Sequence, residues 1–327
     1  MGKSGRYVKA SALLILLGIA AALPWLLGKY QVRILTLAMA WTIATLSLNL
    51  ILGYTGQASL AHGAFLGIGA YAFGIMVQRV GLNFWISLPL ACVVTALLGL
   101  LVGLPSLRTK GPYFAIVTLC FNVIILKVFE NWNWLSGGIQ GQVVPRPAFL
   151  TQRWARYYFV LAFLLLTLVA MRLIVKSLLG VTLMSIRSNE DLAEAVGINS
   201  FRNKLLAFVI SCFVVGLAGA LLALENGQLD FTITNYLYSF YLLIYLLIGG
   251  VATLSGPVVG TIGLYFLLDY MKNIGIKGVE EFRYFLFGLI LLLVIIFFPM
   301  GITGGVKRAW EWARGRFRKG EAGEVAG

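Results

Sequence analysis

Residues 204–224 read KLLAFVISCFVVGLAGALLAL, an unbroken apolar run that follows the charged stretch SNEDLAEAVGINSFRNK at 188–204. A helix rises about 1.5 Å per residue, so about 20 apolar residues are enough to cross the roughly 30 Å hydrocarbon core of a membrane. Comparable runs recur along the chain, and its mean hydropathy is +0.91. Only 12% of its residues are charged, against about 25% in a soluble domain. These features predict an all-α, polytopic membrane protein.

The apolar runs predict how many helices cross the membrane. They cover residues 10–28, 33–52, 60–78, 84–104, 112–129, 157–175, 204–224, 237–271 and 284–299. The run at 237–271 is interrupted by GGVATLSGP at 249–257, and glycine pairs and proline break helices. Splitting this run gives about ten transmembrane helices, and this even count places most of the 26 Lys and Arg residues in the cytoplasm, as the positive-inside rule requires. Both termini are then cytoplasmic.

This topology predicts a transmembrane domain at residues 1–305 and a cytoplasmic C-terminal tail at 306–327. Alternatively, residues 53–60 form a break inside one membrane-crossing unit, which would alter the count but not the orientation. The tail reads VKRAWEWARGRFRK at 306–319, and the whole chain carries a net charge of +14. Because the tail directly follows a span, we expect it to bind anionic membrane lipid and no nucleic acid. Outside the membrane, Glu225 and Asp230 are expected to be solvated surface charges.

The charged stretch at 188–204 lies within a predicted cytoplasmic segment at 176–203. Ionised side chains cost around 3 kcal/mol each at the centre of a span, so this stretch cannot be inserted. Ser188 or Asn189 can cap a short helix, and Gly197 can end it. Leu192, Ala195 and Val196 then form a small apolar face. Two interpretations remain open, a solvated loop helix and a docking helix for a cytoplasmic partner.

The glycine-rich segment GYTGQASLAHGAFLGIGAYAFG at 53–74 carries three polar side chains, Gln57, Ser59 and His62. Irregular backbone at membrane depth is tolerated only where protein or a water-filled cavity satisfies it. The segment is therefore either an ordinary connecting loop or a broken helix that lines a transport path. His62 is the sole histidine and has no companion ligands, so no metal site is expected. The candidate path residues are Tyr54, Gly56, Gln57, Ser59, His62, Thr118 and Asn122.

Several motifs in order resemble those of the branched-chain amino-acid ABC importer permeases, the LivH/LivM family. The motifs are GYTGQASLAHGAFLGIGAY at 53–71, GPYFAIVTL at 111–119, SGGIQG at 136–141, the run at 185–222, and the glycine-rich turn at 249–260. The second, third and fourth of these motifs are similar to the LivM-type subunit in particular. Two departures are Ala61 and the pair Val251-Ala252, where members more often have glycine. The resemblance covers about residues 33–305.

The resemblance implies a permease subunit of an ATP-driven importer in the cytoplasmic (inner) membrane of a prokaryote. Partners would be ABC ATPase subunits, a second, LivH-like permease and an extracytoplasmic solute-binding protein. The pattern Glu194-Ala195-Val196-Gly197-Ile198 resembles the coupling helix that docks the ATPase. The coupling residues implied are Arg187, Asn189, Glu190, Asp191, Leu192, Glu194, Ala195 and Gly197. Branched-chain amino acids are the implied cargo, with urea or another small solute as the alternative.

The chain itself is not expected to be an enzyme or to hold a cofactor. A P-loop needs Gly, four residues and then Gly-Lys-Ser or Gly-Lys-Thr between a strand and a helix. The sole Gly-Lys-Ser, at residues 2–4, lacks the first glycine and the strand, so ATP would be bound by partner subunits. No catalytic residues are predicted. A stand-alone carrier or channel is a further alternative, but the near absence of ionisable groups deep in the spans argues against an ion-coupled carrier.

Overall fold

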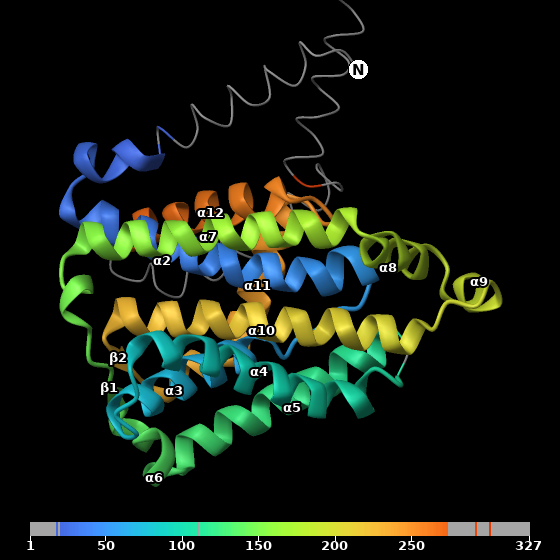
Figure 1. The fold of residues 1–327 in the computed structure, drawn as a ribbon, viewed down its shortest axis with the longest axis horizontal. Helices are drawn as coiled ribbons and strands as arrows, with labels where there is room; N and C mark the ends of the chain where they lie inside the picture. The colour runs from blue at the N-terminus through green and yellow to red at the C-terminus, as the bar shows by residue number, and fades with distance from the viewer. Residues whose placement is uncertain (1–17, 19, 110, 274–291, 293–300, 302–327) are drawn as a thin grey trace, which may run out of the picture.

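The computed structural model describes residues 18, 20–109, 111–273, 292 and 301, with residue 139 described by its backbone alone, and this part of the chain is predominantly helical (Figure 1). The predicted span at 10–28 is described only at residue 18 and from residue 20 onward, where residues 20–26 are helical, the span at 284–299 lies almost entirely outside the described residues, and the tail at 306–327 lies wholly outside them. The ten-helix count is therefore still a prediction.

Long helices account for most of the described chain. They are α2 (Lys29–Leu48), α3 (His62–Gln78), α4 (Phe84–Ser106), α5 (Pro112–Asn131), α7 (Arg153–Lys176), α10 (Ser200–Asn226), α11 (Tyr236–Gly249) and α12 (Ser255–Asn273). Short elements connect them: η1 (Asn49–Gly53), α6 (Asn133–Ser136), η2 (Gly138–Gln140), η3 (Ala148–Leu150), α8 (Leu178–Ser188), α9 (Glu190–Ala195) and η4 (Phe231–Thr234). The strands β1 (Gln142–Val143) and β2 (Gln228–Leu229) pair antiparallel, with Gln142 opposite Leu229.

Each apolar run predicted between residues 33 and 271 coincides with helix, and the run at 237–271 divides into α11 and α12 at the expected break. Five helices in the described part are long and apolar enough to cross a membrane. They are Lys29–Gly53, Phe84–Ser106, Pro112–Asn131, Arg153–Lys176 and Ser200–Asn226. Helices α8 and α11 are apolar but shorter. An all-α membrane protein is thus the observed class.

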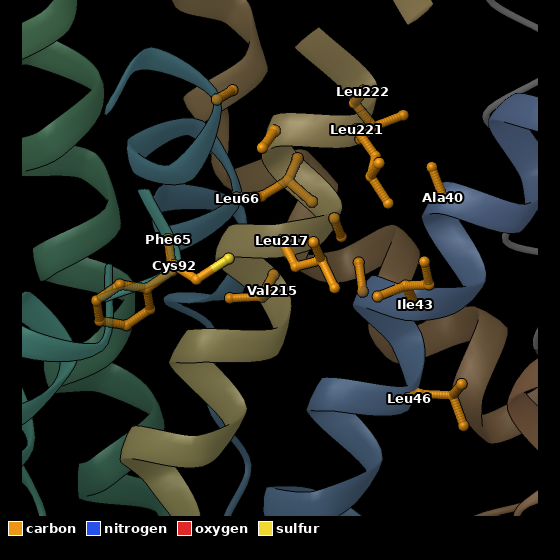
Figure 2. Close-up of a cluster of buried hydrophobic side chains, with 14 of the residues drawn as sticks. Ala40, Ile43, Leu46, Phe65, Leu66, Cys92, Val215, Leu217, Leu221 and Leu222 are labelled. Atoms are coloured by element: carbon orange, nitrogen blue, oxygen red, sulfur yellow. The ribbon is translucent and has the colours of Figure 1, made fainter. Parts of the chain in front are cut away.

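Helix α10 lies at the centre of the bundle and packs against α2 on one side and α3 and α4 on the other. Figure 2 shows Leu217 and Leu221 of α10 in the same cluster as Ile43 of α2 and Leu66 of α3. Close approach of α3 and α10 depends on glycine, because a methyl group at Gly219 would come within 2.0 Å of the Leu66 carbonyl oxygen. Small residues serve this purpose in membrane helix packing, where the hydrophobic effect adds little.

The two ends of the bundle differ. We name them by their elements: the α9 end comprises α8, α9, residues 53–57 and the turn at 250–254. The sheet end comprises β1, β2 and the loop at 144–152. Figure 1 shows α8 and α9 at one end of the long axis and β1 and β2 at the other, with α9 projecting beyond the neighbouring helices. Connections between helices that cross a membrane repeatedly are expected to gather at the two ends of the bundle, as they do here.

Candidate functional site

Near the α9 end, the helical geometry is interrupted between α2 and α3; we call this interruption the break. Helix α2 continues into the π-helical turn η1, and residues 56–61 are not helical. The π-helical turn frees Asn49 to clamp the turn at 250–254: its Nδ2 donates to the Thr253 carbonyl at 2.7 Å, and its Oδ1 accepts from the Ala252 N–H at 2.9 Å. Such π-turns are frequent at functional sites.

Side chains from other helices satisfy the backbone of this break. The Leu60 N–H donates to Thr118 Oγ1 at 3.0 Å, and Asn122 Nδ2 donates to the Leu60 carbonyl at 2.9 Å. Asn122 also donates to Ser239 Oγ at 2.8 Å, and Ser239 Oγ accepts from the Gly63 N–H. A peptide group without a hydrogen-bond partner costs several kcal/mol in hydrocarbon. These side-chain contacts avoid that cost for the peptide groups of the break.

His62 begins α3 and is fully buried beside the break. Its Nδ1 lies 3.1 Å from Ser59 Oγ and its Nε2 lies 2.8 Å from Ser211 Oγ. Ser211 in turn donates to the Ser47 carbonyl at 2.7 Å, so the histidine joins α3, α10 and α2. His62 thus hydrogen-bonds within the bundle through both ring nitrogens. In the described part of the chain, no group of three potential metal ligands is found.

The structure therefore places most of the predicted path residues together. Ser59, His62, Thr118 and Asn122 form the buried polar network around the break. Gln57 is buried next to it, and the Gln57 Oε1 and Asn122 Oδ1 atoms have no hydrogen-bond partner. Their role in transport stays a prediction. Unpaired buried oxygens are costly, and in proteins an ordered water or ion is one of the ways in which they are satisfied.

Two further predicted path residues flank the network. Tyr54 is buried just beyond the end of η1, where burial raises the pKa of its phenol and the Arg187 charge partly opposes that rise. Gly56 is exposed with a φ of +76°, and it packs against the Arg187 side chain. Arg187 also donates to the Gly53 carbonyl oxygen. These contacts connect the break to the segment that carries α9.

Helix α9 is built as its sequence predicts. The Asn189 side chain caps it by accepting from the Leu192 N–H at 3.0 Å. Glu190 and Asp191 occupy the first turn, where the helix dipole favours acidic residues. Gly197 follows the helix with a φ of +88°, a conformation that suits glycine.

The predicted apolar face of α9 is open to its surroundings. Leu192 is 63% exposed and Val196 is 71% exposed, and Glu194 and Ala195 are exposed as well. The helix is fixed to the bundle by an ion pair between Glu190 and the buried Lys204 of α10, at 2.5 Å. An exposed apolar face on a helix that is attached to the bundle in this way is available to a partner.

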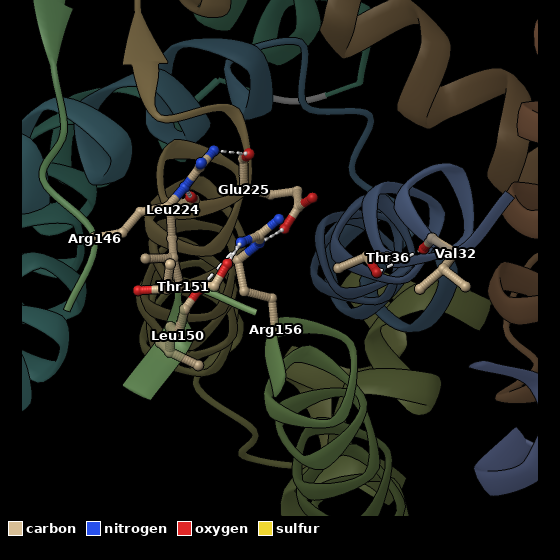
Figure 3. A network of polar contacts seen from close by, with 8 residues as sticks. All are labelled: Val32, Thr36, Arg146, Leu150, Thr151, Arg156, Leu224 and Glu225. Atoms are coloured by element: carbon tan, nitrogen blue, oxygen red, sulfur yellow. Dashed lines mark hydrogen bonds and ion pairs between the residues drawn. The ribbon is translucent and has the colours of Figure 1, made fainter. Parts of the chain in front are cut away.

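The sheet end contains a buried ion pair that the sequence did not predict. Arg156 Nε donates to Glu225 Oε2 at 2.7 Å, and the two side chains are 7% and 3% exposed (Figure 3). The expectation that Glu225 is a solvated surface charge is wrong, because Arg156 neutralises it inside the protein. Arg146 donates to the Leu224 and Glu225 carbonyls, and burial lowers the pKa of its guanidinium.

Sequence reasoning also missed a cavity of about 250 Å³ near the sheet end. Its wall is rich in aromatic side chains and includes two carboxylates. The lining residues are Leu37, Trp41, Leu222, Asn226, Gln228, Leu229, Asp230, Thr232, Ile233, Tyr238, Tyr241, Tyr245, Tyr265, Leu268 and Asp269. The signal was present in α11, where tyrosines at 238, 241 and 245 recur at helical spacing.

Together, the fold and site define a polytopic helical membrane protein with a polar break at its core and a short, exposed helix at one end. The chain matches the family described as "branched-chain amino acid transport system / permease component" over residues 30–295. It therefore belongs to this family of transport permeases. No solved structure gave a match.

Individual relatives support the family assignment. The chain is 30% identical to the high-affinity branched-chain amino acid transport system permease protein LivM of Salmonella typhimurium, over 89% of this chain and 74% of the relative. It is equally identical to the LivM of Escherichia coli, over 91% and 76%. An autoinducer 2 import system permease protein of Escherichia coli, LsrC, is 25% identical over 84% and 82%.

Proposed function

We propose that the chain is the permease subunit of an ATP-driven importer of branched-chain amino acids, with ATP bound by separate subunits. The observation that carries the proposal is the match to this permease family over residues 30–295, taken with the open face of α9. Two LivM relatives transport branched-chain amino acids by their names, which favours this cargo over urea or another small solute. The single-chain carrier or channel is not favoured.

The proposed orientation has the α9 end in the cytoplasm of a prokaryote and the sheet end outside the inner membrane. Counted over the whole sequence, this orientation puts most of the basic residues and both termini on the cytoplasmic side. The ATPase subunits would then meet α9, and a solute-binding protein would meet the sheet end. A second, LivH-like permease would complete the path, and membrane lipid would cover the remaining apolar faces. These partners follow from the family and from the two ends of the bundle.

In this proposal α9 is a lever. Leu192 and Val196 seat in the ATPase, while the Glu190–Lys204 pair and Arg187 transmit its movement to α10 and to the Gly53 carbonyl. Residues 53–57 lead directly into the polar network around His62. A shift of α9 would therefore reach the break at 56–61, which would open to one side of the membrane and then to the other.

Substitution of one exposed side chain tests the lever. Leu192→Glu places a charge on the docking face and should leave the fold intact, because Leu192 is 63% exposed. We expect uptake of radiolabelled leucine by the complete system to fall at least about tenfold, which corresponds to about 1.4 kcal/mol. Leu192→Ile, which keeps the position apolar, is the matched control. Normal uptake by Leu192→Glu, with normal amounts of the protein in the membrane, would show that α9 is an ordinary loop helix.

Composition of the native complex tests the wider proposal. The chain is purified from its own membrane in mild detergent, and the proteins that accompany it are identified by mass spectrometry. An ATPase and a second permease are expected. A chain that purifies alone and transports leucine in liposomes without ATP would instead be a carrier.

A further inference from the structure

The turn at 250–254, between α11 and α12, is fastened to η1 by the side chain of Asn49. This side chain is 1% exposed, and its amide bonds two neighbouring peptide groups, the Ala252 N–H at 2.9 Å and the Thr253 carbonyl at 2.7 Å. These two bonds form the Asn49 clamp. The turn is also braced internally, because Thr253 Oγ1 donates to the Gly250 carbonyl and accepts from the Gly256 N–H.

The clamped backbone has an unfavourable conformation. Ala252 has a φ of +59°, in the left-handed region that a residue with a Cβ atom seldom adopts. Such a conformation persists only where surrounding contacts enforce it, and it is frequent in segments that switch. Because Asn49 Oδ1 accepts from the N–H of this same residue, the clamp is one of the contacts that enforce it. Loss of the clamp would therefore let the turn relax.

The clamp lies directly against the peptide group that Arg187 contacts. A methyl group at Gly53 would come within 2.9 Å of the Ala252 nitrogen and closer still to Asn49 Oδ1. Gly53 also accepts from Arg187 through its carbonyl oxygen, and Arg187 stands two residues before the Asn189 cap of α9. Packed atoms transmit displacement because they cannot be compressed. A shift of α9 that moves Arg187 would therefore move Gly53 against or away from the clamp.

The turn also leads into the buried polar network through α11. This helix ends at the turn and carries Ser239, whose Oγ accepts from the Gly63 N–H and from Asn122 Nδ2, both at 2.8 Å. With 14 residues, α11 joins the turn to Ser239 as one rigid element. The clamp thus acts on the break from two directions, because η1 precedes the break in the chain and α11 supports the residues that follow it.

We propose that Asn49 is a positioning residue that keeps the break sealed, and that movement of α9 opens the break by releasing the Asn49 clamp. This inference rests on the proposed function and adds the step between Arg187 and the opening. In the clamped arrangement the residues of the polar network are fully buried: Ser59, His62, Thr118 and Asn122. Two neutral hydrogen bonds suit this role, because together they bias an equilibrium by only about five- to a hundredfold and can be broken in each cycle.

Passive efflux of leucine tests the clamp. The native complex is reconstituted in liposomes loaded with radiolabelled leucine, and efflux is followed without ATP and without solute-binding protein. Asn49→Leu keeps a side chain of similar size but removes both bonds. We expect this variant to raise the efflux rate about tenfold or more, because the sealed arrangement loses its bias. A role in stability alone would leave efflux at the native rate in protein that is still folded.

Ser136→Ala is the matched control. Ser136 is fully buried, and its hydroxyl donates to the Phe129 carbonyl and accepts from the Gly138 N–H. It therefore also joins one side chain to two peptide groups, but away from the break, and we expect native efflux. Equal leakage from Ser136→Ala and Asn49→Leu would show that efflux reports a loosened bundle. Native efflux from folded Asn49→Leu would show that the clamp does not seal the break. Either result would overturn the inference.

Hydrogen exchange of the native complex provides a test that needs no variant. Exchange is measured by mass spectrometry without nucleotide and with a non-hydrolysable ATP analogue. Residues 250–254 should exchange at least about tenfold faster in one of the two states, because the released Ala252 N–H loses its acceptor. Residues 228–230 at the sheet end should keep one rate. The same exchange of residues 250–254 in both states would contradict release of the clamp.

Uptake measurements separate this inference from the proposed function. ATP-driven leucine uptake by the native complex, together with native efflux from Asn49→Leu, would leave the importer proposal standing and remove the role of Asn49. Fast efflux from Asn49→Leu in a complex that takes up no leucine with ATP would support the clamp and remove the importer proposal.

Discussion

The sheet end and the α9 end of the bundle are held together in different ways. At the sheet end, two strands pair, Arg146 donates to two α10 carbonyls, and Arg156 forms an almost fully buried ion pair with Glu225. At the α9 end, the polar links include the Glu190–Lys204 pair, in which Glu190 is partly exposed, the Arg187 contact with Gly53, and the Asn49 clamp.

This difference indicates that the two ends differ in rigidity. Buried charges that are fully paired hold one geometry, because separating them leaves an uncompensated charge in a low dielectric. In the Glu190–Lys204 pair only Lys204 is fully buried, so water can take the place of one partner, and this pair is held less firmly than the pair at the sheet end. The sheet end is thus suited to be a rigid frame, and the α9 end is suited to move. The predictions below test this contrast, from the largest expected effect to the smallest.

The largest effect is expected at the sheet end. Arg156→Met leaves Glu225 buried without its partner, which should lower the stability of the folded protein by about 3–5 kcal/mol. Thermal unfolding of the detergent-solubilised protein, followed by tryptophan fluorescence, measures the change. The double variant Arg156→Met/Glu225→Met should recover part of the loss, because no buried charge remains.

Recovery in the double variant should be incomplete. Arg156 also donates to the Leu150 and Thr151 carbonyls, at 3.1 and 2.8 Å, and methionine cannot replace those bonds. A double variant that is less stable than Arg156→Met alone would contradict the account of Glu225 as an uncompensated charge. A single variant as stable as the native protein would remove the contrast between the two ends.

The helical framework was largely predictable from the sequence, and the sheet end was not. The positions of helices follow from local sequence, because apolar runs long enough to span the membrane mark the long helices. The Asn189 cap and Gly197 likewise mark the start and the end of α9. The Arg156–Glu225 pair joins residues 69 positions apart, so their proximity depends on how α7 and α10 pack. The cavity likewise needs six elements brought together, α2, α10, β2, η4, α11 and α12. For the polar break, the sequence supplied the residues but not their network, because Asn122 and Ser239 come from separate helices.

The ion pair at the α9 end should matter locally. Lys204→Met removes the partner of Glu190, which is partly exposed and can be hydrated, so overall stability should fall by only about 1 kcal/mol. Hydrogen exchange measured by mass spectrometry should nevertheless become faster in residues 190–197, while residues 228–230 at the sheet end keep their native rates. Faster exchange at both ends, or at neither, would mean that this pair is not what fixes α9.

The smallest effect is expected in the turn at 250–254. Ala252 has a φ of +59°, a left-handed conformation that costs a residue with a Cβ atom about 1 kcal/mol. Glycine relieves this cost, although it loses more entropy on folding and removes a methyl group packed against the core. Ala252→Gly should therefore raise stability by about 0.5 kcal/mol.

Ala70→Gly is the matched control within helix α3, where the same change should lower stability by about 1 kcal/mol. Thermal unfolding compares the two variants. Shifts of opposite sign would show that the turn clamped by Asn49 stores conformational strain at the α9 end, whereas destabilisation by both would mean that the Ala252 methyl contributes more through packing than its backbone conformation costs.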